Sequence, residues 1–187
     1  MDTPSTALIL IDMQNDVLET IVPTGRQVVP AIKQTLETFR RLGLPVIHCL
    51  RLHRANGVDV EKFRLETFRK HPFLVPGTSG GEVIPELTPL PGEQIVSKSR
   101  FSGFFQTDLL MMVQRLGIKR LVVVGLQTPN CVRATVTDAL AYDLDVVVLD
   151  DAITALTPEI HRANMYDMEH MGAVISTVDE FLATLEK

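Results

Sequence analysis

Short apolar runs rich in β-branched residues alternate along this chain with longer segments of helical period. This alternation predicts βαβ units, in which parallel strands are joined by crossover helices. Several runs lack in-out alternation, as expected for strands covered on both faces. The strands are expected at 7–11, 45–50, 93–96, 120–125, 145–149 and 173–176. The predicted fold class is α/β, a three-layer α/β/α sandwich with a mostly parallel, six-stranded, Rossmann-like sheet.

Segments of helical period separate these runs, and glycines stand where helix C-caps are expected, at Gly43 and Gly117. The helices are expected at 27–42, 107–116, 132–142, 158–171 and 178–185. The stretch 53–91 differs because it is rich in proline and glycine and has little periodicity, with one short helix expected at 60–69. Long irregular segments of this kind often form lids or partner contacts. A chain of 187 residues suits one domain, so we expect a single domain over 1–187.

Composition excludes several classes of function. The formal net charge is −5 and no stripe of Lys and Arg is present, which argues against binding to nucleic acid. The apolar runs are too short to span a bilayer, and no G-x-G-x-x-G follows the first strand, so neither a membrane nor a dinucleotide cofactor is expected. Two cysteines and an N-terminus without a basic region favour the cytoplasm. A small-molecule partner is therefore expected, with no cofactor.

Cys131 is the main candidate for chemistry. It follows the apolar strand 121–124 and the turn 125–130, at the expected start of a helix. Free backbone N–H groups and the positive end of a helix dipole would lower the pKa of a thiol there and make it nucleophilic. The alternative is a buried, unreactive cysteine, which is the interpretation we favour for Cys49 inside a strand.

Asp12 and Lys98 each end another predicted strand, and the carboxyl ends of parallel strands meet at one sheet edge. A carboxylate beside a thiol can exchange a proton with it, and an ammonium group stabilises both negative charges. Taken singly, Asp12 could be a turn cap and Lys98 a solvated surface residue. Together with Cys131 they predict an active site at this edge.

Three phrases of the sequence, 7–16, 95–104 and 125–133, resemble the isochorismatase-like cysteine hydrolases, whose members include nicotinamidases, N-carbamoylsarcosine amidohydrolases and ureidoacrylate amidohydrolases. In the amidase members, residues at the positions of Asp12, Lys98 and Cys131 form the catalytic triad. The resemblance also implies a cis peptide bond at Leu126-Gln127 and an oxyanion hole made by the N–H groups of Gln127 and Cys131. Candidate substrate-binding residues are Gln14, His53, Phe101 and Phe104.

The resemblance implies a cysteine amidohydrolase that cleaves the C–N bond of a small amide or ureido substrate through a thioester and releases ammonia or an amine. It also implies a homo-oligomer, either a dimer or a tetramer. Two alternatives remain, an isochorismatase-type vinyl-ether hydrolase, whose members typically lack the cysteine, and a catalytically silent binding or scaffold member of the family.

The nicotinamidase branch binds a metal through an Asp-x-His pair, but this chain has Arg51-Leu52-His53 at the matching place, so no metal is expected. His53 could contact substrate or be a surface histidine. Three arginines, Arg51, Arg54 and Arg100, could bind a substrate carboxylate or could be exposed charges.

Overall fold

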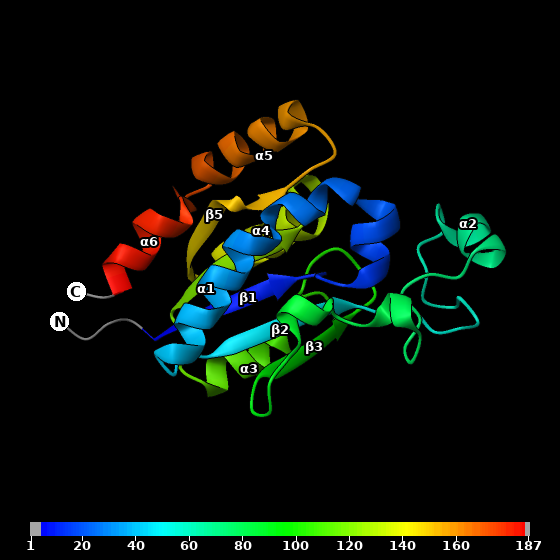
Figure 1. Ribbon diagram of the computed structural model, residues 1–187, viewed down its shortest axis with the longest axis horizontal. Coiled ribbons are helices and arrows are strands. Elements are labelled where there is room, and N and C mark those ends of the chain that lie inside the picture. The colour runs from blue at the N-terminus through cyan, green and yellow to red at the C-terminus, as the bar shows by residue number, and fades with distance from the viewer. Residues whose placement is uncertain (1–4, 186–187) are drawn as a thin grey trace.

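A computed structural model describes residues 5–185 and contains one six-stranded sheet whose strand order is β3-β2-β1-β4-β5-β6. Every pairing between neighbouring strands is parallel, which confirms the predicted fold class. The carboxyl ends of the strands point toward one edge, on the side where α2 lies in Figure 1. The strands are β1 (Thr6–Ile11), β2 (Val46–Arg51), β3 (Gln94–Lys98), β4 (Arg120–Leu126), β5 (Asp145–Thr154) and β6 (Val174–Ser176).

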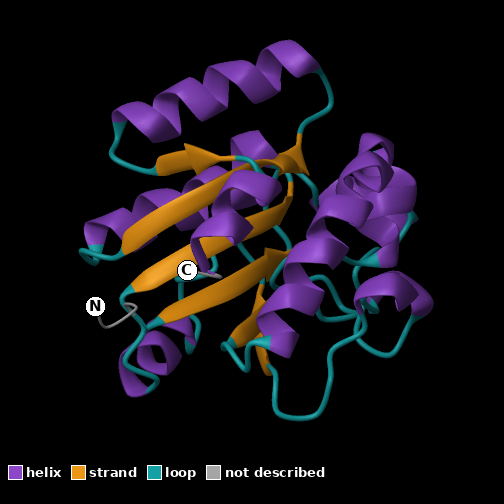
Figure 2. Cartoon of the chain, turned by 60° about the vertical axis from the view of Figure 1, so that its left-hand side comes forward, coloured by secondary structure: helices purple, strands orange, loops and turns teal. Residues whose placement is uncertain are grey.

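Helices cover both faces of the sheet, as Figure 2 shows. Two of them, α1 (Val29–Arg41) and α6 (Val178–Leu185), bury side chains in one apolar cluster. On the other face, α3 (Leu109–Arg115), α4 (Arg133–Ala141) and α5 (Pro158–His170) contribute to a second cluster. Shorter helical turns are η1 (Val17–Ile21), η2 (Pro23–Val28), η3 (Ser79–Gly81), η4 (Pro85–Leu87) and η5 (Thr128–Val132), and α2 spans Leu65–Lys70. None of the described helices has the length and apolarity needed to cross a bilayer.

The apolar strands form because both of their faces are buried. In β1 the side chains of Leu8 and Leu10 belong to the cluster under α1, whereas Ile9 and Ile11 belong to the cluster under α3 and α4. A run of β-branched and leucine residues satisfies both environments, which explains the absence of alternation in the sequence.

Most predicted elements are confirmed within two residues, and the differences have local causes. The helix expected at 27–42 begins at Val29 because 23–28 form a 3₁₀ turn, and Pro30 occupies its first turn, where the missing N–H costs nothing. The helix expected at 60–69 is shorter than predicted, because only α2 (Leu65–Lys70) is helical there. β5 continues to Thr154 after an irregularity in its register with β4 between Val123 and Gly125.

A buried polar group ties α1 and β2 to the start of β3. The Glu93 carboxylate accepts hydrogen bonds from Arg40 Nε at 2.7 Å, His48 Nε2 at 2.8 Å and the Leu90 N–H at 2.9 Å. Although burial works in the opposite direction, these donors lower the pKa of Glu93 to about 2. Burial lowers the pKa of His48, so its neutral ring donates to Glu93.

Replacement of Glu93 by Gln should lower the free energy of unfolding at pH 7 by about 2–3 kcal/mol, because Arg40 loses its charged partner. The folded pKa of Glu93 lies below its unfolded value near 4.5, so its stabilisation is present above pH 4.5 and is lost as the pH falls toward 2. Urea unfolding at pH 7 and at pH 3 measures both effects.

The control is Glu86→Gln, which removes a half-exposed ion pair with Arg26 and should change stability by less than about 1 kcal/mol. Equal losses of stability in the two variants at pH 7, or a difference between them that does not shrink from pH 7 to pH 3, would contradict the role given to Glu93.

Candidate active site

Asp12 follows the last residue of β1, at the edge where the strands end. Its φ is 53°, a left-handed conformation that aspartate tolerates better than most residues, and its N–H donates to Cys49 O on β2 at 2.9 Å. On the other side, Gly125 has φ 113°, and a Cβ there would lie 2.2 Å from Ile11 O. Only glycine lets β4 approach the end of β1 this closely. The local backbone therefore brings the turn after β4 against Asp12.

Asp12 and Lys98 form a buried ion pair. Lys98 Nζ donates to Asp12 Oδ2 at 2.8 Å and to Arg100 O at 3.2 Å, and the two charged side chains are at most 3% exposed. Burial is the largest single effect and lowers the pKa of Lys98, but the charge of Asp12, its hydrogen bond and the two neighbouring cysteines together outweigh burial and raise that pKa, so the lysine stays charged. Asp12 Oδ1 is also buried and has no hydrogen-bond partner among the described residues. This oxygen is therefore available as a proton acceptor.

Cys131 lies in η5, one turn before α4, and is only 4% exposed. Its Sγ accepts a long hydrogen bond from Arg51 Nη1 at 3.6 Å. Cys131 and Asp12 line the same small cavity, together with Arg51, Gln127 and Asn130. The structure thus brings Cys131 and Asp12 together, and Lys98 joins them through its ion pair with Asp12. This is the clustering at one sheet edge that was predicted from the positions of the strand ends.

The expected lowering of the Cys131 pKa is wrong. Burial raises the pKa of the thiol to about 11, and the charge of Asp12 adds to this, whereas Lys98 and Arg51 oppose it. The expected lowering depends on free N–H groups and the dipole of a helix that begins at Cys131, but Cys131 is buried in a π-helical turn and α4 begins two residues later. The thiol is therefore neutral at rest and needs a base to become nucleophilic.

The peptide bond Leu126-Gln127 is cis, which confirms the expectation based on the family resemblance. It connects the end of β4 to η5, the turn that carries Cys131. The assignment of the Gln127 and Cys131 N–H groups to an oxyanion hole remains a prediction.

Sequence reasoning missed Glu61, which contacts Arg51 from the irregular segment after β2. Arg51 Nη2 donates to Glu61 Oε1, and both side chains are nearly fully buried. The guanidinium also lies 5.1 Å from the centre of the Phe101 ring. Glu61 comes from a segment without periodicity, so no sequence signal placed it here. The ion pair fixes Arg51 beside the thiol.

His53 is fully buried and not a surface histidine. Its Nε2 accepts from Arg51 Nε at 3.3 Å, and its ring packs edge-on against Phe68 and Phe73. Burial, followed by the charge of Arg51, lowers the pKa of His53 to about 4, so the ring is neutral.

These residues do not fit the metal of the nicotinamidase branch. The guanidinium of Arg51 stands where that branch has a carboxylate, and it occupies the lone pair of His53 Nε2. Over residues 5–185, no group of three His, Cys, Asp or Glu side chains has an arrangement that could hold a metal ion.

The remaining substrate-binding candidates have different environments. The Gln14 amide is fully buried, and its hydrogen bonds within the described part of the chain go to backbone groups: Nε2 donates to Arg51 O at 2.9 Å and Gly81 O at 2.8 Å, and Oε1 accepts from the Arg51 N–H. Gln14 thus positions the backbone of Arg51. Phe101 lies beneath Arg51, beside the cavity wall. Phe104 packs 5.4 Å from Tyr142, beyond the C-terminal end of α4, and does not line the cavity at Cys131.

A chain of hydrogen bonds connects η5 to α5 and β5. The sequence did not suggest it. Thr128, fully buried, bonds His161 Nδ1 through Oγ1 at 2.9 Å, and His161 Nε2 bonds Asp150 Oδ1 at 2.9 Å. Thr128 is three residues before Cys131, and His161 is on α5. This chain therefore fixes the turn that carries the thiol, and these three residues are positioning residues.

Comparison with known proteins agrees with this geometry. A family model described as the isochorismatase domain matches residues 6–180. The chain belongs to this family. The crystal structure of an isochorismatase family protein from Desulfovibrio vulgaris is similar, with a TM-score of 0.94, 38% identity and coverage of 99% of this chain and 100% of that chain. The family membership shows a hydrolase of the isochorismatase-like type.

Two curated relatives carry functional names. A protein of Arabidopsis thaliana named "Probable inactive nicotinamidase" is 40% identical over 185 residues, which cover 95% of this chain and 94% of the relative. The ureidoacrylate amidohydrolase RutB of Rhizobium rhizogenes is 31% identical over 211 aligned positions, which cover 97% of this chain and 84% of RutB. Each name describes that relative.

The substitution Asp12→Asn should have opposite effects on two properties, making the Cys131 thiolate easier to form but slowing hydrolysis. Removal of the Asp12 charge should lower the pKa of Cys131, because one of the effects that raise it is lost while Lys98 and Arg51 still lower it; burial of the thiol continues to raise it. The variant should nevertheless lose roughly 10²–10⁴-fold of any hydrolytic rate, because no base remains. The pH dependence of Cys131 alkylation by iodoacetamide, followed by mass spectrometry, measures the pKa. A raised or unchanged pKa would contradict the assigned electrostatics.

Thr128→Val and His161→Leu should each slow the alkylation of Cys131 several-fold, because each breaks the chain that holds η5. The double variant should be no slower than the slower single variant, since residues in one network are not additive. Arg162→Gln on the same helix breaks only an exposed contact with Glu159 and serves as the control. Additive losses would show that Thr128 and His161 act separately.

Proposed function

We propose that the protein is a cysteine amidohydrolase that cleaves the C–N bond of a small amide or ureido compound through a thioester. The observation that carries the proposal is the placement of Cys131 in one buried cavity with Asp12, whose Oδ1 is unpartnered. The similarity to RutB, named a ureidoacrylate amidohydrolase, supports the ureido class.

In the proposed first half-reaction, Asp12 Oδ1 accepts the proton of the Cys131 thiol as Sγ attacks the carbonyl carbon. Proton transfer to Asp12 is required in this step because the resting thiol has a pKa of about 11. The carbonyl oxygen becomes an oxyanion, for which the N–H groups of Gln127 and Cys131 are the proposed donors. Asp12 then returns the proton to the nitrogen, the C–N bond breaks, and ammonia or an amine leaves a thioester.

In the second half-reaction, water attacks the thioester carbon and gives a proton to Asp12. The C–S bond then breaks, Asp12 reprotonates the thiolate, and the acid product leaves. Lys98 remains charged throughout and holds Asp12 by their 2.8 Å hydrogen bond. The sum of both steps is amide plus water giving acid plus amine, with the enzyme unchanged.

The test is ammonia release from ureidoacrylate, N-carbamoyl amino acids, maleamate and nicotinamide, measured for the wild-type protein and for Cys131→Ala. Release that disappears in Cys131→Ala, together with an acyl-enzyme mass at Cys131 after rapid quenching, is expected. Release that survives the substitution would refute the thiol mechanism.

Absence of release from every substrate would favour a catalytically silent member, a possibility that the name of the Arabidopsis relative brings forward. Consumption of isochorismate that persists in Cys131→Ala would favour the vinyl-ether hydrolase. Each result therefore selects one of the three functions.

A further inference from the structure

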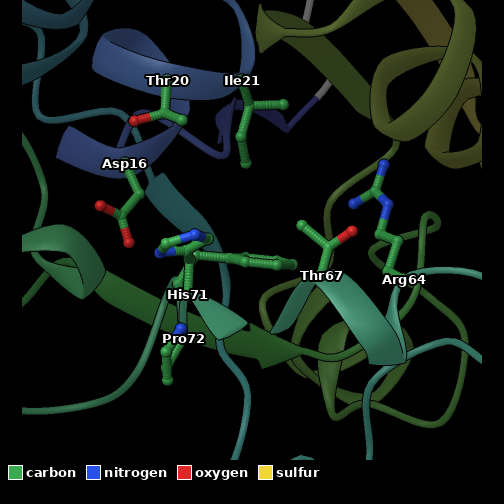
Figure 3. Close-up of a pocket in the computed structure, with 8 residues that line it drawn as sticks. Asp16, Thr20, Ile21, Arg64, Thr67, His71 and Pro72 are labelled. Carbon is green, nitrogen blue, oxygen red and sulfur yellow. The ribbon is translucent and has the colours of Figure 1, made fainter. Parts of the chain in front are cut away.

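The cavity at Cys131 is too small for an amide substrate. Its volume is about 20 Å³, which is room for roughly one water molecule. A second cavity of about 440 Å³ lies next to it, within the size range of small-molecule sites. Asp16, Thr20 and Ile21 come from η1 and the residue before it, and Arg64, Thr67 and His71 come from α2 and its two ends (Figure 3).

Two side chains separate these cavities. Ile21 and Arg64 line both the small cavity with the thiol and the large outer cavity. Ile21 ends η1, and Arg64 is the residue before α2, so each lies at the end of a short helical element. A change of rotamer at these two positions would join the outer cavity to Cys131.

The charge of Arg64 is not matched by a carboxylate. Its guanidinium lies 5.1 Å from the Phe63 ring centre and 5.7 Å from the Phe101 ring centre, and no ion pair of Arg64 occurs within the described residues. The other cations near the thiol differ, since Arg51 pairs with Glu61 and Lys98 pairs with Asp12. Arg64 is therefore a partly buried cation with open hydrogen-bond donors at the boundary of the two cavities.

The surroundings of Arg64 favour an incoming anion. Burial lowers the pKa of Arg64, and the positive charge of Arg51 lowers it further. A bound anion would counteract both effects by stabilising the charged guanidinium. A guanidinium binds a carboxylate with two parallel hydrogen bonds. Asp16, the carboxylate of the outer cavity, lies across it from Arg64 in Figure 3 and accepts a hydrogen bond from the Leu74 N–H at 2.7 Å. The cavity thus has a cationic end next to the thiol.

On the basis of the proposed amidohydrolase function, we propose that the outer cavity binds the non-reacting part of a substrate that carries a carboxylate. Arg64 binds that carboxylate and, with Ile21, opens the passage to Cys131. The substrate class is therefore a small anionic amide or ureido acid, and Arg64 determines this specificity. We assign this role to Arg64 and not to the other arginines, because Arg51 is paired with Glu61, Arg54 is exposed and lines neither cavity, and Arg100 donates to backbone oxygens.

The test compares two thiol reagents of similar size that differ in charge, iodoacetate and iodoacetamide. In both reactions the Cys131 sulfur forms an S–C bond, iodide leaves, and the thiol proton passes to Asp12 or solvent. Each rate on Cys131 is divided by the rate of the same reagent with free cysteine. Arg64→Gln should lower the iodoacetate to iodoacetamide ratio by about tenfold, the effect of one charge-assisted hydrogen bond.

Three further variants sharpen the result. Arg69→Gln removes an exposed arginine of the same helix that lines neither cavity and should leave the ratio unchanged. Arg64→Lys retains the charge and should restore most of the ratio. Ile21→Ala should raise both rates without changing their ratio, because it widens the passage alone. An unchanged ratio in Arg64→Gln, or an equal fall in Arg69→Gln, would overturn the proposal.

Alkylation does not depend on hydrolysis, so failure of this inference and failure of the proposed function can be distinguished. If the protein hydrolyses ureidoacrylate but its iodoacetate to iodoacetamide ratio does not depend on Arg64, the amidohydrolase function is supported and the anion subsite is refuted. A ratio that depends on Arg64 without hydrolysis of any amide would preserve the subsite and refute the amidohydrolase. If both hold, Arg64→Gln should raise the KM for ureidoacrylate about tenfold and leave that for its methyl ester unchanged.

Discussion

The ion pair between Lys98 and Asp12 connects the ends of β3 and β1 across β2, and the sheet edge that carries the candidate active site depends on it. Both groups are withdrawn from water, which is costly unless each charge has a close partner. The lysine satisfies the carboxylate at Oδ2 and leaves Oδ1 for a proton. The same pair acts on the thiol, whose pKa is raised mainly by burial: the Asp12 charge also opposes thiolate formation, and Lys98 favours it. Structure and proton chemistry therefore rest on one contact.

A second layer of contacts holds the thiol in place from two directions. On the inner side, Arg51 is fixed by Glu61 through its guanidinium and by Gln14 through its backbone, and it donates to Cys131 Sγ. On the outer side, Thr128 and His161 hold η5 against α5. Because the reacting groups are already positioned, little reorganisation remains for the chemical step.

The sheet and the charged residues at the ends of its strands could be predicted from the sequence. Asp12 and Lys98 stand out because each is a charged residue at the end of a predicted strand, and parallel strands place such residues at one edge. Glu61 and Arg64 could not be found this way, since they come from a segment without period whose path is set by tertiary contacts. The contact between Thr128 and His161 joins residues 33 positions apart on different elements. The predicted direction of the Cys131 pKa shift was wrong, because the burial of this residue could not be inferred from the turn sequence.

The segment between β2 and β3 carries α2 and Arg64, and α2 lies beyond the carboxyl ends of the strands (Figure 1), whereas Leu74, Ile84 and Leu87 of the same segment are buried in the core. The reacting groups come from strand ends and from η5, whereas one wall of the outer cavity comes from this segment. In the proposed function, the groups that cleave the bond and the side chain that selects the substrate thus come from separate stretches of the chain. Substitutions or length changes around α2 that keep Glu61 in place would then alter which molecules are accepted and leave the thiol and its base in position.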